Sequence, residues 1–352
     1  MKTAVPYSTE KPALKIRISL PGARAFQTLP DDMGNSTPIR IMDEAGIKEA
    51  AAIIRAGGLV AFATETVYGL GGDATNGEAV ARIYAAKGRP SFNPLISHVP
   101  DLAGVMTIAL MDDRAKALAD AFWPGPLTLV LNRTETSNIA ALTTAGLSTV
   151  AVRIPARKNA RRFLEVCGVP VAAPSANASG AVSTTQAGHV AASLPGPEEG
   201  GPEIILDDGP CEVGLESTVV DLSTDTATLL RPGGLSKEGV ERILGPIAIA
   251  GADDNTPKSP GMMSRHYAPK AKLRMNAERA NDDEVYLGFG SAGESGGLNL
   301  SADGDLTQAA ANLFQMLHLL DDEGVSAIAV APIPETGLGL AINDRLRRAV
   351  RS

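Results

Sequence analysis

The chain has 352 residues, 44% of them hydrophobic and 20% charged, which is enough for about two folded domains and excludes global disorder. The formal net charge of -8 argues against a broad basic face for duplex nucleic acid, while a local basic pocket stays compatible with it. Two cysteines and four scattered histidines predict no disulfide framework and no metal site, and they fit a reducing, cytoplasmic location.

Helices and strands alternate from residue 41 to residue 245, after a proline-containing stretch, 1–40, that is predicted to be a poorly ordered extension. An apolar stripe from Ile47 to Ile54 predicts a helix that ends at Gly57-Gly58. The later elements are predicted as helices after Asn76-Gly77, over 112–122 and over 158–167, and as strands over 59–64, 95–99, 128–132, 149–154 and 170–176. Strands 217–223 and 227–231 flank a short polar turn and predict a hairpin, so this is an α/β domain with a mixed sheet.

A stretch rich in Gly, Pro, Ser and Asp predicts a linker over 246–270. A second, small α/β domain is predicted over 271–352. Its elements are strands at 284–290 and 327–333, an amphipathic helix at 306–322 and a terminal helix at 340–350.

Four clusters before the linker can carry chemistry. The first, TETVYGLGGDA (64–74), places hydroxyls and glycines in a turn after a strand, and either a small polar ligand or an ordinary loop explains it. The second, KGRPSFNP (87–94), combines Lys87, Arg89 and Asn93 on a proline-stiffened segment. It is either a helix cap or an anion site.

The third cluster joins AVRIPAR (151–157) with PSANASG (174–180), each at the carboxyl end of a predicted strand, where open α/β sheets bind ligands. Arg153 needs an anionic partner there, which is either a structural carboxylate or a ligand. The fourth joins GLESTVV (214–220) with LLRPGG (229–234), and the hairpin brings Ser217 and Arg231 together. Lys87, Arg89, Arg153 and Arg231 would then form a cationic cluster for a nucleoside triphosphate.

Common nucleotide and hydrolase motifs are absent from the sequence. It has no GxxxxGK[ST] loop, no complete GxGxxG and no GxSxG elbow. The acidic residues near the strand ends, Glu65, Asp73 and Glu216, lack a spacing typical of paired catalytic carboxylates.

Taken together and in order, TETVYGLG, KGRPSFNPLI, WPGPLTLVL, AVRIP, PSANASG, GLESTVVDL and LLRPGG resemble the YrdC/Sua5 family of threonylcarbamoyl-AMP synthases. SPGMMSRHYAPKA (259–271) is similar to the Sua5 linker, and GLGLAINDRLRRA to its C-terminal domain, so the resemblance implies the two-domain Sua5 form. The first ~40 residues are not covered. Two departures are Arg157, where the family often has histidine, and Ser97, where it often has an aliphatic residue.

The resemblance implies a YrdC-like open twisted sheet with a large cavity and a small Rossmann-like C-terminal domain. It implies a reaction of L-threonine, bicarbonate and ATP, with Mg²⁺, to threonylcarbamoyl-AMP and pyrophosphate, which serves the threonylcarbamoyl modification of adenosine 37 in tRNA. The implied catalytic residues are Lys87 and Arg89, near the phosphates. The implied ATP contacts are Arg89, Asn93, Thr149, Ser175, Ser183, Arg231 and Tyr267. The implied threonine contacts are Thr66, His98, Arg153, Ala173 and Ser217.

We expect Arg153 to pair with the threonine carboxylate and the linker to lie over the nucleotide through Tyr267. The carbamate of threonine is itself a nucleophile, so the site must align it and neutralise phosphate charge. Proteins that transfer the product to tRNA are expected partners. The implied reaction needs no stable nucleic-acid complex. We also expect no membrane partner, because no apolar run approaches the ~18–20 residues of a span.

Two alternatives belong to other classes. An RNA-binding module would use the cationic cavity without catalysis, but the net charge and the few aromatic residues weigh against it. A carbamoyl-phosphate-using relative, like the YrdC-like part of hydrogenase-maturation proteins, would carry zinc-finger cysteines and an acylphosphatase segment, which this sequence lacks.

Overall fold

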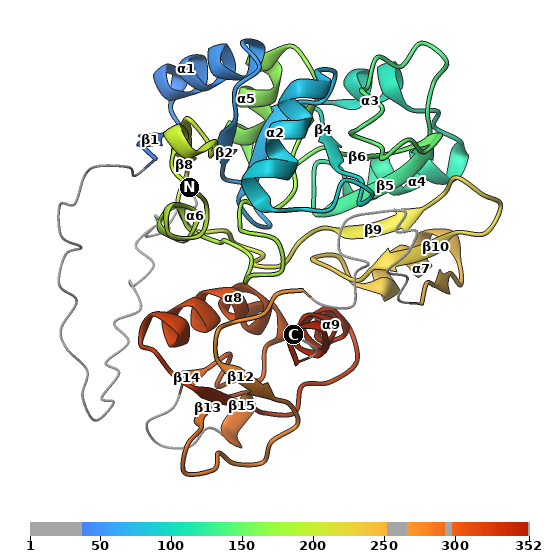
Figure 1. Ribbon diagram of the computed structural model, residues 1–352. Coiled ribbons are helices and arrows are strands. Elements are labelled where there is room, and N and C mark those ends of the chain that lie inside the picture. Colours follow the sequence, from blue (N-terminus) through green and yellow to red (C-terminus); the bar gives the residue numbers. More distant parts are fainter. Residues whose placement is uncertain (1–36, 252–265, 293–297, 351–352) are drawn as a thin grey trace, which may run out of the picture.

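The computed structural model describes residues 37–251, 266–292 and 298–350, and Figure 1 shows that they form a large and a small unit. The large unit (blue to yellow) is built around one sheet and the small unit (orange to red) around another. The predictions for residues 1–36 and for the linker residues 252–265 lie outside the described residues.

The large sheet mixes parallel and antiparallel pairs, as the sequence predicts, in the order β1-β8-β2-β3-β7-β4-β6-β5-β9-β10-β11. Strands β9 and β10 form the predicted antiparallel hairpin. The strands are β1 (Ile39–Ile41), β2 (Val60–Phe62), β3 (Gly69–Asp73), β4 (Ile96–His98), β5 (Leu127–Asn132), β6 (Thr149–Arg153), β7 (Val171–Ala172), β8 (Ile204–Asp207), β9 (Thr218–Asp221), β10 (Thr228–Arg231) and β11 (Ala248–Ile249).

Strand β1 begins inside the stretch 1–40 that composition assigns to the extension. Residues of β1 pair in parallel with β8. Pro38 directly precedes this strand, and its carbonyl accepts a hydrogen bond from the amide of Ile205 at 2.9 Å. A proline is tolerated at the start of an edge strand because its missing N–H is not needed there, so proline content conceals the strand.

Side-chain caps start most of the α-helices of the large unit, and α5 and α6 are the exceptions among those described. The Asp43 carboxylate accepts hydrogen bonds from the amides of Ala45 (3.0 Å) and Gly46 (2.9 Å). Gly88 ends α2 with a φ of 60°, a left-handed conformation that glycine adopts readily, directly after Lys87. The helices are α1 (Glu44–Arg55), α2 (Gly77–Lys87), α3 (Leu102–Ile108), α4 (Asp113–Phe122), α5 (Lys158–Cys167), α6 (Ala187–Ser193) and α7 (Lys237–Leu244).

The glycine-rich segment after Tyr68 is a strand and not the turn that its composition predicts. It forms β3, which is antiparallel to β2 and β7. A Cβ on Gly71 would lie 2.9 Å from Val171 Cγ1 and 3.0 Å from Phe62 Cε1, so a side chain has no room. The glycines serve close packing between neighbouring strands, a use that turn propensities do not reveal.

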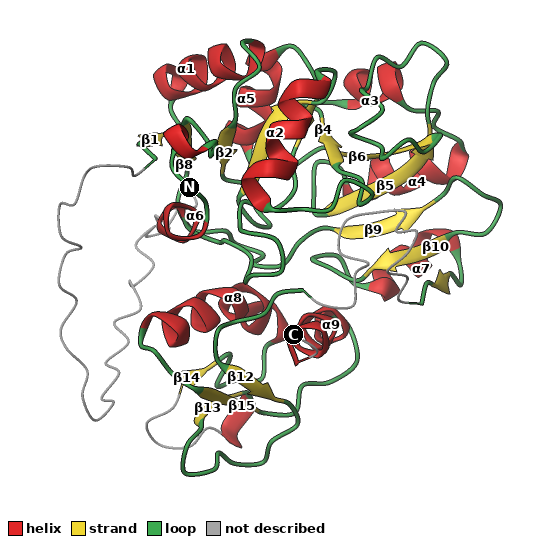
Figure 2. Ribbon diagram, viewed as in Figure 1, coloured by secondary structure: helices red, strands yellow, loops and turns green. Residues whose placement is uncertain are grey.

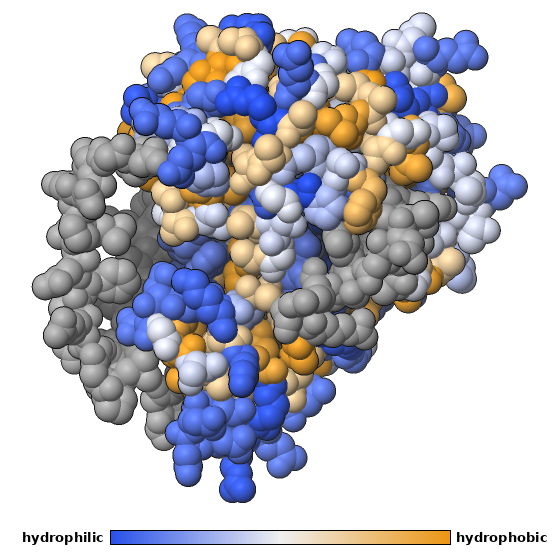
Figure 3. Space-filling view, in the orientation of Figure 1, coloured by the Kyte–Doolittle hydropathy of each residue, from blue (hydrophilic) through white to orange (hydrophobic). Residues whose placement is uncertain are grey.

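The small unit has a parallel sheet in the order β12-β15-β13-β14, and its two helices lie between this sheet and the large unit (Figure 2). Hydrophilic side chains cover its outer end, blue at the bottom of Figure 3. No helix in the described ranges combines the length and the apolarity of a membrane span. The elements are β12 (Lys272–Arg274), β13 (Val285–Gly288), β14 (Leu298–Asn299), α8 (Leu306–Asp322), β15 (Ala327–Val330) and α9 (Leu338–Val350).

The two units share an apolar core. Val67, Val182 and Leu215 of the large unit pack in one buried cluster with residues of α8 and α9. Gly214 approaches α8 so closely that a Cβ would lie 2.5 Å from Ala311 Cα. The small unit is therefore seated directly on loops of the large one.

Candidate functional site

A buried cavity of about 40 Å³ lies where the large unit meets the small one, and residues of all four sequence clusters line it. Ile96 and His98, two positions apart on β4, both line it, so it lies against one face of the sheet. Of the predicted site residues, those that line the cavity are Thr66, Arg89, His98, Arg153, Ala173, Ser175, Ser217, Arg231 and Tyr267.

The strand ends of the third cluster do not meet at one edge of the sheet. Strand β6 ends at Arg153 and runs parallel to β4, whereas β7, which precedes residues 173–175, runs antiparallel to β4. Their carboxyl ends therefore point to opposite edges, and the strand-end rule of open parallel sheets does not place this site. Both segments nevertheless reach the same cavity.

The predicted cationic cluster forms, and backbone carbonyls hold it. Lys87 Nζ donates to the carbonyl of Ser175 at 2.7 Å and to that of Asn177. Arg89 donates to the carbonyls of Asn93 (3.3 Å) and Pro94 (3.1 Å). Burial, followed by the charge of Arg89, lowers the pKa of Lys87 well below its usual range, and burial lowers the pKa of Arg89 to about 10. For Lys87 and Arg89, these carbonyls satisfy the donors without cancelling the positive charge, so this part of the cluster favours an anion.

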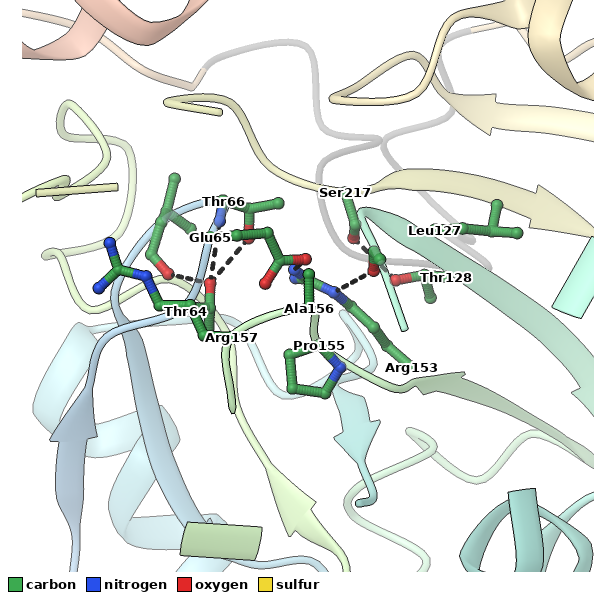
Figure 4. Close-up of polar contacts among 12 residues, drawn as sticks. Thr64, Glu65, Thr66, Leu127, Thr128, Arg153, Pro155, Ala156, Arg157 and Ser217 are labelled. Carbon is green, nitrogen blue, oxygen red and sulfur yellow. Dashed lines mark hydrogen bonds and ion pairs between the residues drawn. The ribbon is translucent and has the colours of Figure 1, made fainter. Parts of the chain in front are cut away.

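Arg153 has the structural carboxylate partner that the sequence leaves open as one alternative. Its Nη2 lies 2.5 Å from Glu65 Oε1, in a buried ion pair shown in Figure 4, and its Nε donates to the Gly125 carbonyl at 3.3 Å. Arg153 also lines the cavity, whereas Glu65 does not. Glu65 thus holds the guanidinium from outside, at a position that the spacing of acidic residues does not reveal.

Hydroxyl groups form two pairs beside the cavity (Figure 4). Thr64 and Thr66 share a hydrogen bond of 2.9 Å between their hydroxyls, and Thr64 Oγ1 donates to the Val67 carbonyl at 2.6 Å. Ser217 Oγ lies 2.7 Å from Thr128 Oγ1 and accepts from Arg231 Nη2 at 3.1 Å. The predicted proximity of Ser217 and Arg231 is confirmed.

His98 is a neutral group in this cavity. Burial, and secondarily the charge of Arg153, lowers the pKa of His98 to about 3. Its Nδ1 is buried and has no hydrogen-bond partner among the described residues. A neutral imidazole with an unused ring nitrogen can donate to or accept from a polar ligand.

Glu216 lines the cavity, and sequence reasoning missed its role. Its Oε2 accepts from Arg345 Nε of α9 at 2.8 Å, and its Oε1 accepts from the hydroxyl of Ser183. Burial opposes its ionisation, but the charges of Arg345 and Arg231 outweigh this effect and lower the pKa of Glu216 to about 2. A signal existed in the sequence, because Arg345 falls on the apolar face of the predicted helix, between Ile342 and Ala349.

Tyr267 and His266 cover the cavity from the end of the linker. Tyr267 has a φ of 66°, is 1% exposed and packs its ring against Phe314 at a centroid distance of 5.8 Å. These side chains leave about 40 Å³, less than the large cavity that the resemblance implies. The difference arises because the small unit and the end of the linker fill the hollow of the sheet.

Three predicted ATP contacts and Lys87 do not line the cavity. Asn93 and Ser183 are buried next to it, through their bonds to Arg89 and Glu216, and Lys87 is held behind Ser175. Thr149 lies at the opposite end of β6 from Arg153, paired with Asn132 of β5.

Among the described residues, no group of three or more His, Cys, Asp or Glu side chains could hold a metal ion. Glu216 lines the cavity, but both of its oxygens have protein donors.

Arg157, the first departure from the family pattern, has a local structural task. It donates to the Asp208 carbonyl at 2.6 Å and pairs with Glu212 at 2.8 Å, so it fastens the loop that carries Cys211. Cys211 is buried and free.

Fold and site define a class: a two-domain α/β protein whose large domain holds buried cations in a cavity covered by the small domain. Residues 52–233 match the Sua5/YciO/YrdC family model, described as Telomere recombination, and residues 235–350 match the model described as Threonylcarbamoyl-AMP synthase, C-terminal domain. The chain belongs to the Sua5/YrdC family, in its two-domain form.

Relatives agree over nearly the whole chain. A protein named Threonylcarbamoyl-AMP synthase from Pyrococcus abyssi is 43% identical over 328 residues, which cover 88% of this chain and 95% of that protein. Its namesake from Bacillus subtilis is 40% identical over 348 residues, covering 93% and 97%. The crystal structure of P. abyssi Sua5 complexed with L-threonine matches with a TM-score of 0.80 and 40% identity, over 90% of this chain and 96% of that one.

Proposed function

We propose that this enzyme is a threonylcarbamoyl-AMP synthase that converts L-threonine, bicarbonate and ATP to threonylcarbamoyl-AMP and pyrophosphate. Its similarity to proteins of that name extends over both domains. The observation that carries the proposal is the meeting of Arg89, Arg153 and Arg231, from three distant segments, in one buried cavity. Such a cavity suits a substrate with several negative charges.

The threonine side of the cavity is the better formed one. Thr66, His98, Arg153, Ala173 and Ser217 all line it. We propose that Arg153, with its planar guanidinium, binds the threonine carboxylate. The neutral His98 and the hydroxyls of Thr66 and Ser217 would contact the rest of the amino acid. Binding requires that the carboxylate share Arg153 with Glu65.

We assign the triphosphate to Arg89 and Arg231, with Lys87 adding charge from behind Ser175. Ser175, Ser183, Asn93 and Tyr267 are the other proposed ATP contacts near the cavity, and Thr149 stays a prediction at the far end of β6. Mg²⁺ enters as part of the nucleotide. Accommodating ATP requires that Tyr267 and the small domain make room.

The chemistry needs no activated serine or cysteine. The threonine amine adds to the carbon of CO2 with loss of a proton, or to that of bicarbonate with loss of water, and forms a carbamate. A carbamate oxygen then attacks the α-phosphorus while the bond from that phosphorus to pyrophosphate breaks. The residues of the chain align the two substrates and stabilise charge on the phosphates. We place the reaction in a reducing cytoplasm, because Cys167 and Cys211 are both free. The product would pass to proteins that modify tRNA.

The test is pyrophosphate release from ATP by the full chain, with and without threonine and bicarbonate, combined with mass detection of the adenylate. Release that needs both co-substrates supports the proposal. Salt-sensitive RNA binding without pyrophosphate release would instead favour an RNA-binding module. Turnover with carbamoyl phosphate in place of threonine and bicarbonate would point to the hydrogenase-maturation type of relative.

A further inference from the structure

Arg345 is a buried cation outside the residues that the family resemblance places in the site. It lies on α9 of the small domain, and its side chain is 1% exposed. Its Nε donates to Glu216 Oε2 at 2.8 Å, and its Nη1 donates to the Pro232 carbonyl at 2.9 Å, next to Arg231. Its guanidinium carbon lies 4.9 Å from the centre of the Tyr267 ring. One side chain of the small domain thus contacts two residues that line the cavity, Glu216 and Tyr267, and the residue that follows a third, Arg231.

The contact with Glu216 affects the charge of the cavity. Glu216 contributes a carboxylate to a lining whose other charged side chains are arginines. A buried carboxylate repels phosphate groups more strongly than an exposed one, because little water screens it. Arg345 does not line the cavity, so it offsets this negative charge from behind. The same carboxylate accepts a hydrogen bond from Ser183, a proposed ATP contact.

We propose that Arg345 is a positioning residue for the nucleotide, which neutralises Glu216 and holds Ser183 and Tyr267 in place for ATP. The small domain thereby sets the ATP affinity of a cavity that belongs to the large domain. This inference rests on the proposed function and concerns ATP rather than threonine.

The charges of Glu216 and Arg345 predict how single and double variants bind ATP. The Glu216–Arg345 pair is neutral. Asp344 also lies 2.8 Å from Arg345 Nη1, but it pairs with Arg348 as well and is the same in every variant. Arg345→Met leaves the charge of Glu216 uncompensated, and the double variant Glu216→Gln/Arg345→Met removes that charge. We expect Arg345→Met to raise the Kd for ATP at least about tenfold and the double variant to regain most of that loss. If Arg345 merely held the fold together, Arg345→Met would lower the free energy of unfolding and raise the KM values for ATP and for threonine alike.

The experiment is calorimetric titration of the full chain with ATP alone, so that it does not depend on turnover. The matched control is Arg347→Met on the same helix, whose side chain is 45% exposed and pairs with Glu335. We expect the control to bind ATP as the wild type does. In the coupled assay, Arg345→Met should raise the KM for ATP and leave the KM for threonine within about twofold.

Equal ATP affinities of Arg345→Met and Arg347→Met would overturn the inference, and so would a double variant weaker than Arg345→Met. Should Arg345→Met fail to fold, Glu216→Gln decides. The Glu216→Gln variant keeps an acceptor for the Ser183 hydroxyl and leaves the positive charge of Arg345 beside the cavity. ATP should therefore bind more tightly to this variant than to the wild type. Weaker binding would contradict the inference. Wild-type chain that binds ATP but releases no pyrophosphate with threonine would refute the proposed function alone.

Discussion

Basic side chains beside the cavity and at the outer surface of the small domain are held in different ways. In the large domain, Lys87 and Arg89 are buried and donate to backbone carbonyls. In the small domain, Arg274 and Arg347 lie at the surface and pair with Glu284 and Glu335. A carbonyl satisfies a donor but leaves its positive charge in place, whereas a carboxylate cancels that charge. Burial without a counter-charge therefore marks the region that binds an anion.

The strands of the two domains also differ in how they pack. Strand β3 of the large domain contains three glycines and packs by close approach of backbones, while β13 of the small domain buries Tyr286 and Leu287 in the ordinary way. The domain whose sequence departs from local rules is the one that carries the site.

The largest effect is expected for Arg153→Ala, which removes the proposed partner of the threonine carboxylate. Loss of charge-assisted hydrogen bonds costs about 1.5–3 kcal/mol, so the KM for threonine should rise roughly 10–150-fold. Steady-state kinetics with threonine and ATP varied separately measures it, and urea unfolding shows whether the buried Glu65, left without its partner, also lowers stability. An unchanged KM for threonine would disprove the assignment.

Gly71→Ala should be next, and it tests the difference between the two kinds of strand. A Cβ there would lie 2.9 Å from Val171 and 3.0 Å from Phe62, so crowding should lower the free energy of unfolding by about 1–3 kcal/mol. Gly77→Ala is the matched control, because nothing lies within 4 Å of its Cβ. Equal denaturation midpoints for the two variants would contradict the close-packing account.

A smaller effect is expected on the pH dependence of stability, from a pair of histidines where the domains meet. The rings of His189 and His318 stack at 3.9 Å, and His318 Nε2 lies 3.0 Å from the Ser183 carbonyl. Burial, and secondarily the charge of His318, lowers the pKa of His189 to about 3; burial also lowers the pKa of His318. Both rings are therefore neutral when folded and titrate near 6.5 when unfolded.

The unfolded chain binds more protons in this window, so stability is lost as the pH falls from about 6.5 toward about 3. His318→Gln removes one titrating group and keeps a donor for the Ser183 carbonyl. Its thermal midpoint should fall less than that of the wild type between about pH 7.5 and pH 5. Parallel curves for the two proteins would exclude a contribution of this pair.

The smallest effect is expected for Arg347→Ala. Its pair with Glu335 joins side chains that are 45% and 56% exposed, and solvent-exposed pairs contribute little to stability. Thermal midpoint and turnover should both stay close to the wild-type values. A loss of activity comparable to that of Arg153→Ala would erase the distinction between the two domains.

Regular elements were predictable because their patterns are local. The apolar stripe of α8 and the polar turn between β9 and β10 each show within a few residues. The gathering of Arg89, Arg153 and Arg231 was predictable because each stands in a motif whose order matches a known family.

What the sequence does not reveal depends on distant contacts. Glu216 and Arg345 are 129 residues apart, and Glu65 and Arg153 are 88 apart, so no spacing rule connects them. The sequence did not predict strand β3, because a glycine that allows close packing cannot be distinguished in sequence from a glycine that forms a turn. The strand directions at β6 and β7 follow from the whole sheet and not from either segment alone.

The apolar cluster that Val67, Val182 and Leu215 share with α8 and α9 has a practical consequence for anyone who wishes to shorten this protein. A truncation after the large domain would leave these three side chains in water and invite self-association. A minimal enzyme cut from this chain would therefore need polar replacements at all three positions before its activity could be judged.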